Sequence, residues 1–240
     1  MNLSANIIKS FIKLFLFSIL LVLILLSGCA PLSSKTDIKT LLTDQQIKFA
    51  GTKQILLVID NSSFFFTERK VYAFEKKEDI WQIAFEPVDA VIGRKGFAPT
   101  GEKREGDGRT PTGIFSLKTA FGYDESINTK MPYRQALEDD LWIDDPEAID
   151  YNRWVKKSKT KAKSYERMRR DDNLYKYGIV IEYNTDPVIK GYGSAIFLHT
   201  WHNKWKTTEG CVAVSKENIL KILYWLDPQA KPLIIIRQEN

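Results

Sequence analysis

The sequence predicts a mainly β domain of the α+β class: a β-sandwich or barrel with inserted helical material and one helix near the C-terminus. Three observations predict it. Short apolar runs bounded by polar or turn residues recur along the chain, which is typical of buried strands. A charged stretch at 124–176 interrupts them. Near the C-terminus, one segment spaces its apolar residues as a helix does.

The strand-like runs follow one another in a regular order. Two of them, 71–74 and 80–85, flank a short polar loop and predict a hairpin. The full set of predicted strands is 54–60, 71–74, 80–85, 88–93, a strand beginning at Ile114, 177–183, 194–199, 211–214 and 233–236.

The predicted helix spans 216–226. Ser215 is a good N-cap residue, and Asp227-Pro228 ends the helical pattern. Upstream, the glycine-rich stretch 93–113 predicts a structured surface loop in which Thr110-Pro111-Thr112-Gly113 forms a tight turn. It lacks the Gly-Lys-Ser/Thr ending and the following helix of a phosphate-binding loop, so we do not expect one.

The N-terminus has the features of an export signal. Residues 1–28 combine two lysines, no acidic residue and an apolar run from Leu14 to Leu26, followed by Ser27-Gly28-Cys29. The ending Leu-Ser-Gly-Cys resembles the bacterial lipobox, which implies a signal peptide at 1–28, lipidation of Cys29 and a tether at 29–53. The strand-like runs begin at Gln54, so we expect one folded domain over 54–240. The alternative is a transmembrane anchor. Ala30 resembles an outer-membrane sorting signal, which places the protein on the periplasmic face of the envelope.

Composition excludes few classes of function, but it narrows the partners. Apolar residues make up 44% of the chain, and the net charge of +5 falls to +3 once Lys9 and Lys13 are removed. This mild bias comes without a recognisable nucleic-acid-binding module, so we expect no nucleic-acid partner. We also expect no cofactor and a monomer.

The segment 124–176 is read as an insertion or lid with two possible roles. Its first half is acidic and its second half is basic, with Trp142, Tyr151 and Trp154 between them. One interpretation is a solvated, partly helical excursion whose charges offset each other. The other is a lid or wall that contacts an anionic or sugar-bearing substrate.

The strongest chemical signal is the pair His199 and Cys211. Each adjoins a predicted strand, so a short loop between the strands would bring a thiol beside an imidazole, which is a nucleophile with its own base. The backbone N–H groups of Gly210 and Cys211 suit an oxyanion hole. The alternatives are a cysteine that merely fills the core and a histidine that ends a strand. We expect no metal, because only His199, His202 and Cys211 offer nitrogen or sulfur ligands.

Three motifs together resemble the L,D-transpeptidase catalytic domain, also called YkuD: 106–115, 196–199 and 208–215. The resemblance spans about 54–237. It implies a β-sandwich-like domain that acts on peptidoglycan stem peptides, with Cys211 as nucleophile and His199 as base, oriented by a local backbone carbonyl. It also implies release of D-Ala from a tetrapeptide stem, a thioester intermediate and a 3→3 cross-link. Backbone support would come from Gly210, Cys211 and Thr200, and substrate contacts from Thr208, Glu209, Arg109, Trp142 and Trp201.

The chain departs from the commoner family pattern at two positions. Glu209 occupies the position of the usual histidine, and Ala213 that of the usual Arg or Asn. We consider a capping role, a pairing with Lys204 or Lys206, or a part in the acceptor site for Glu209, and a compensating role for His202. These departures leave open an L,D-carboxypeptidase or hydrolase that uses the same thioester, and a non-catalytic lipoprotein that binds the cell wall.

Overall fold

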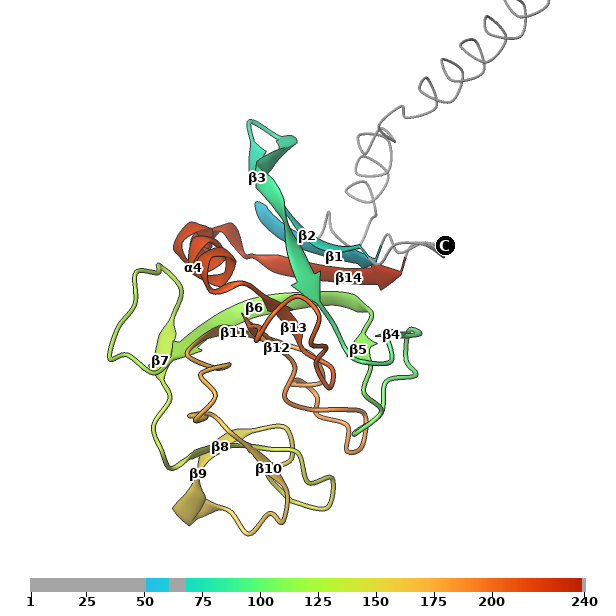
Figure 1. Cartoon of the computed structure of the whole chain (residues 1–240), viewed down its shortest axis with the longest axis vertical. Helices are drawn as coiled ribbons and strands as arrows, with labels where there is room; N and C mark the ends of the chain where they lie inside the picture. The colour runs from blue at the N-terminus through green and yellow to red at the C-terminus, as the bar shows by residue number, and fades with distance from the viewer. Residues whose placement is uncertain (1–50, 61–67, 239–240) are drawn as a thin grey trace, which may run out of the picture. The chain divides into compact units, whose positions relative to one another are not determined.

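The computed structural model describes residues 51–60 and 68–238, and shows a sandwich built from one continuous sheet (Figure 1). The strands of the large sheet are β1 (Gln54–Asp60), β2 (Arg69–Lys77), β3 (Ile80–Val91), β6 (Gly113–Gly122), β7 (Tyr133–Gln135), β11 (Tyr177–Ile181), β12 (Phe197–Thr200), β13 (Val212–Val214) and β14 (Leu233–Gln238). The predicted lipidation site Cys29, the predicted signal peptide and most of the predicted tether lie outside these residues.

Two long strands join the halves of the sandwich. The order of the sheet is β11-β12-β13-β3-β2-β1-β14-β6-β7, and β6 pairs with both β14 and β11. Irregular register between β2 and β3 marks the point where β3 bends from one half to the other. The buried core lies between the halves and includes Leu56, Ile179 and Val212. The predicted mainly β fold is confirmed.

The C-terminal helix was predicted correctly. The helix α4 (Lys216–Trp225) begins after Ser215, whose side chain accepts a hydrogen bond from the amide of Asn218. Its buried residues, Ile219, Ile222 and Leu223, belong to the core between the halves of the sandwich. Within the described part of the chain no helix is long and apolar enough to cross a membrane.

Two local predictions were wrong. The run 88–93 is not a separate strand, because most of it continues β3. Thr110 and Pro111 do not turn: they form the short strand β5 (Thr110–Pro111), which pairs in parallel with β4 (Phe97–Ala98). The side chain of Thr110 is fully buried, which favours an extended, anchored backbone over an exposed turn.

The segment 124–176 contains no α-helix, so the predicted helical insertion was wrong. It forms β7 and a small sheet of β8 (Asp140–Ile143), β9 (Trp154–Lys156) and β10 (Tyr165–Arg167), with a 3-10 turn, η1 (Lys157–Lys159). Trp142 and Trp154 stand opposite each other on β8 and β9. Cross-strand aromatic pairs stabilise sheets, and the opposite charges pair between strands, as Asp140 does with Lys156 and Arg134.

Candidate active site

The register of two parallel strands places Cys211 and His199 on one side of the sheet. Leu198 pairs with Val212 and His199 with Ala213. Leu198 and Val212 belong to the core of the sandwich. Because side chains alternate along a strand, His199 and Cys211 face the opposite side. Both line one cavity of about 430 Å³. The pairing of thiol and imidazole as nucleophile and base stays a prediction.

The thiol of Cys211 is buried and held by backbone groups. Its Sγ lies 3.2 Å from the carbonyl oxygen of Ala195, to which it donates, and it accepts from the amide of Phe197 at 3.4 Å. Burial raises the pKa of Cys211 to about 12, and the Phe197 amide offsets this only in part. The resting thiol is therefore neutral at physiological pH.

His199 is also buried and is oriented by a neighbouring carbonyl. Its Nδ1 lies 2.8 Å from the backbone oxygen of Thr200, so a proton on Nδ1 leaves Nε2 as the basic nitrogen. Burial lowers the pKa of His199 to about 4, which keeps the imidazole neutral and able to accept a proton. The ring of Tyr175 packs edge-on against it, with centroids 5.1 Å apart. The backbone carbonyl of Thr200 therefore orients the His199 ring.

Two threonines fix the backbone of the nucleophile. The hydroxyls of Thr208 and Thr110 donate to the carbonyl oxygen of Cys211 at 2.6 and 3.4 Å. Thr110 also accepts from the amide of Gly93 at 2.8 Å. The amide of Gly210 donates to the hydroxyl of Thr208 at 3.2 Å, so in this state the predicted oxyanion donor is already engaged. Gly210 has φ 153°, and a Cβ there would stand 3.0 Å from the Arg109 carbonyl oxygen.

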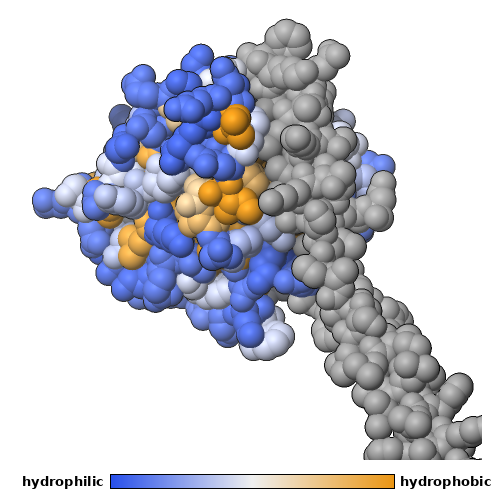
Figure 2. All heavy atoms as spheres, turned by 90° about the horizontal axis from the view of Figure 1, so that it is seen from above, coloured by the Kyte–Doolittle hydropathy of each residue, from blue (hydrophilic) through white to orange (hydrophobic). Residues whose placement is uncertain are grey.

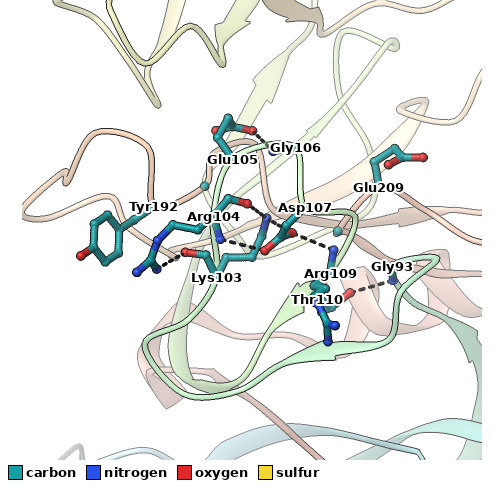
Figure 3. A network of polar contacts seen from close by, with 12 residues as sticks. Gly93, Lys103, Arg104, Glu105, Gly106, Asp107, Arg109, Thr110, Tyr192 and Glu209 are labelled. Atoms are coloured by element: carbon teal, nitrogen blue, oxygen red, sulfur yellow. Dashed lines mark hydrogen bonds and ion pairs between the residues drawn. The ribbon is translucent and has the colours of Figure 1, made fainter.

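Asp107 organises the glycine-rich loop next to these threonines (Figure 3). Its carboxylate accepts from Lys103 Nζ at 2.7 Å and from the amides of Arg104 and Arg109, each at 2.8 Å. Burial pushes the pKa of Asp107 upward, but these donors hold it below its usual range. The loop carries Lys103, Glu105 and Gly106 to the cavity wall, which the sequence reasoning missed.

A family profile assigns the chain to a known family, and a structural comparison finds a similar solved structure. The profile of the L,D-transpeptidase catalytic domain (YkuD) matches residues 57–235. The chain belongs to this family. A search of curated proteins finds no match. Among solved structures, the chain is similar to the helical cell shape determining protein Pgp2 from Campylobacter jejuni, at 15% identity and a TM-score of 0.41. The alignment covers 79% of this chain and 49% of Pgp2.

The segment 124–176 supplies one wall of this L,D-transpeptidase-family cavity. The residues that it contributes are Asp144, Glu166, Arg170, Asp172, Leu174 and Tyr175. Burial raises the pKa of Asp144 and of Glu166, although Arg170 pairs with Glu166 at 3.0 Å. These residues agree with the wall interpretation of the segment; whether the wall moves as a lid stays a prediction.

The predicted substrate residues divide into two groups. Thr208, Glu209 and Trp201 line the cavity together with His202. Arg109 and Trp142 are not among its lining residues. Arg109 donates to the carbonyl of Phe97 at 2.9 Å. Trp142 is buried behind the site and donates to Asn152 at 2.8 Å. The two side chains therefore lie outside the cavity lining, contrary to the prediction that they contact the substrate.

Glu209 has a partner that the sequence did not predict. Its two carboxylate oxygens accept from Arg94 Nε at 2.9 and 3.1 Å, so the expected pairing with Lys204 or Lys206 is replaced by one with Arg94. The bridge between Gly93 and Thr208 brings the two residues together. Backbone hydrogen bonds from Arg94 to Thr208 and from Thr208 to Ile92 extend the bridge. The sequence spacing gives no sign of the ion pair between Glu209 and Arg94.

Among residues 51–60 and 68–238, no three His, Cys, Asp or Glu side chains gather closely enough to hold a metal ion.

Proposed function

We propose that the protein is a peptidoglycan L,D-transpeptidase. The observation that carries the proposal is the placement of a buried thiol and a neutral imidazole on adjacent parallel strands of one cavity. Membership of the L,D-transpeptidase family supports it. The substrate would be a tetrapeptide stem that ends in D-Ala, and the product a 3→3 cross-link.

The first half of the proposed reaction forms a thioester. Cys211 Sγ attacks the carbonyl carbon of meso-diaminopimelate that precedes the terminal D-Ala, and His199 takes the thiol proton. The C–N bond then breaks, and His199 returns this proton to the departing nitrogen of D-Ala. A base that transfers a proton in the transition state typically contributes about 10²–10⁴-fold in rate.

The second half transfers the acyl group to an amine. The side-chain amine of a neighbouring stem attacks the thioester carbon, the C–S bond breaks, and the proton released by the amine reaches the thiolate through His199. Water in place of the amine gives a tripeptide instead, which is the carboxypeptidase outcome. The same cavity serves both steps because the thioester stays on Cys211.

In the resting site the thiol does not point at its base, so substrate binding has to reorient it. The thiol donates to the carbonyl of Ala195, and both reacting groups are neutral. Attack requires the S–H to turn from Ala195 toward His199, so that proton transfer and C–S bond formation proceed together. We propose that the stem peptide, lying against 194–196, triggers this turn.

We further propose that the protein works at the periplasmic face of the cell envelope, anchored by lipid on Cys29 and favouring the outer membrane. The signal-like residues 1–28 support this. Metabolic labelling with a fatty acid should mark the intact protein, and the Cys29→Ser variant should carry no label. Labelling of that variant would contradict the lipid anchor.

A muropeptide assay tests the proposed reaction. Purified residues 30–240 and their Cys211→Ala variant are incubated with disaccharide-tetrapeptide, and mass spectrometry reads the products. A dimer lacking one D-Ala, absent from the variant, is the expected result. A tripeptide alone would replace transpeptidation with hydrolysis. Equal products from both proteins would refute catalysis by Cys211.

A further inference from the structure

The loop between the two catalytic strands exposes a tryptophan. Trp205 is 81% exposed, the most exposed of the aromatic residues among the large apolar side chains at the described surface. The face shown in Figure 2 is mostly hydrophilic, with a gathered patch of hydrophobic residues near its centre. Trp205 stands in 201–207, whose members Trp201, His202 and Lys206 line the active-site cavity. The indole therefore lies in the loop that forms the rim of the cavity.

The turn that carries Trp205 is braced from within. The side-chain oxygen of Asn203 accepts from the amides of Trp205 and Lys206 at 2.9 and 3.1 Å. A local bond of this kind fixes the backbone of a turn without covering the side chain at its tip. The loop thus presents the indole in a defined position and leaves it exposed to solvent.

The charge around the indole is positive. Lys204 Nζ stands 4.8 Å from the centre of the Trp205 ring, and Lys206 follows directly. An exposed aromatic face binds the apolar face of a sugar ring, because the ring supplies a large rigid surface at low cost in conformational entropy. The flanking ammonium groups suit the carboxylates of the peptide that such a sugar carries.

We propose that 201–207 is a saccharide subsite, in which Trp205 stacks on an amino sugar of the glycan strand that bears the stem peptide. The inference rests on the proposed function, since it takes the reacting end of the stem to lie at Cys211. The sugar is several residues from the scissile bond. An extended peptide of that length reaches beyond the cavity, at roughly 3.3–3.6 Å per residue.

Other exposed aromatic residues differ from Trp205 in exposure or in position. A cation lies over both Tyr192 and Trp205, but Tyr192 is 38% exposed beneath Arg104, whereas Trp205 stays 81% exposed beside Lys204. Tyr224 is 63% exposed on α4, and it lines a separate cavity. Tyr224 is therefore the matched control: an exposed aromatic residue that lies outside the loop whose members line the catalytic cavity.

A membrane surface is the competing occupant, because tryptophan between lysines is also typical of membrane interfaces. The geometry favours the sugar, since residues of the same loop line the catalytic cavity and a bilayer pressed against them would obstruct its rim.

The test measures binding rather than turnover. Residues 30–240 carrying Cys211→Ala are titrated by calorimetry with disaccharide-tetrapeptide and with the free tetrapeptide. We expect the disaccharide form to bind about tenfold more tightly, as a single well-placed aromatic contact would give. Adding Trp205→Ala should remove this difference and leave the free tetrapeptide affinity unchanged. Adding Tyr224→Ala should preserve the difference.

Three outcomes would overturn the subsite: equal affinity for both ligands, a preference that survives Trp205→Ala, or equal loss with Tyr224→Ala. Binding to vesicles of phosphatidylethanolamine and phosphatidylglycerol that requires Trp205, with no sugar preference, would assign the loop to a membrane instead. Binding of the disaccharide through Trp205 without any binding of free tetrapeptide would support the subsite while contradicting the proposed stem-peptide function.

Discussion

The catalytic strands and the wall formed by 124–176 reach the same cavity by different means. His199 and Cys211 are placed by the parallel register of β12 and β13, with Leu198 and Val212 buried on the other side. The wall is placed by side-chain contacts, such as Arg170 with Glu166 and Trp142 with Asn152. The positions of the reacting groups therefore depend on backbone register, whereas the shape of the cavity depends on buried polar pairs.

The largest effect should come from the base. His199→Ala removes the proton acceptor, so kcat should fall by about 10²–10⁴-fold in the muropeptide assay. The variant keeps the register of β12, and circular dichroism should match the parent. A loss smaller than tenfold would show that another group moves the proton.

The next largest effect should come from the buried ion pair in the glycine-rich loop beside the nucleophile. Asp107→Asn removes the partner of Lys103, whose side chain is only 4% exposed. We expect the free energy of unfolding to fall by about 2–4 kcal/mol, because a buried charge loses its counter-ion. Urea denaturation measures this. Asp79→Asn breaks an ion pair whose carboxylate is 94% exposed and serves as control, with stability expected to match the parent.

Acid stability tests the burial of the base. Because burial lowers the pKa of His199 to about 4 from 6.5, the unfolded chain takes up a proton below pH 6.5 that the folded chain refuses until about pH 4. This group therefore lowers stability as the pH falls from 6.5 to 4, by roughly 2–4 kcal/mol. His199→Gln should flatten this part of the pH–stability curve relative to the parent. Parallel curves would contradict the buried, neutral imidazole.

A smaller effect is expected behind the wall. Trp142→Phe keeps the aromatic packing but leaves the Asn152 oxygen with one donor fewer, since Asn152 also accepts from the amide of Ala195 at 3.2 Å. Stability should fall by about 1–2 kcal/mol. Thermal unfolding checks this, and an unchanged Tm would show that the wall does not depend on this bond.

The smallest effect should follow from Glu209→Gln. The side chain of Glu209 is 76% exposed in its pair with Arg94, so stability should stay within about 0.5 kcal/mol of the parent. If Glu209 only braces the rim of the cavity, the ratio of cross-linked dimer to tripeptide should also stay unchanged. A shift toward tripeptide would instead assign Glu209 to the acceptor side.

Sequence predicted the parts of the fold that repeat a local pattern. The run at 54–60, the Ser215 cap and the two strands that carry His199 and Cys211 follow apolar periodicity and local capping, which are readable without the fold. Helical material at 124–176 was a wrong prediction, because the aromatic residues there pack across strands that meet only in the folded chain.

The polar partners of the site could not be read from the sequence for the same reason. Glu209 meets Arg94 and Cys211 meets Thr110 across separations of 115 and 101 residues. The contacts of Asp107 could in principle be read from the sequence. An aspartate in a glycine-rich loop often accepts hydrogen bonds from backbone amides a few residues away. Its bonds to the neighbouring amides of Arg104 and Arg109 are of that local kind.

The most direct test of the account is the intact mass of the protein during turnover. Residues 30–240 are mixed with tetrapeptide stem, quenched in acid and weighed, alongside Cys211→Ala and His199→Ala. We expect the parent protein to gain a mass equal to the stem minus D-Ala, and peptide mapping should locate this adduct on Cys211. The adduct should be absent from Cys211→Ala and should form much more slowly in His199→Ala. An adduct on another residue, or product formation with no adduct requiring Cys211, would contradict it.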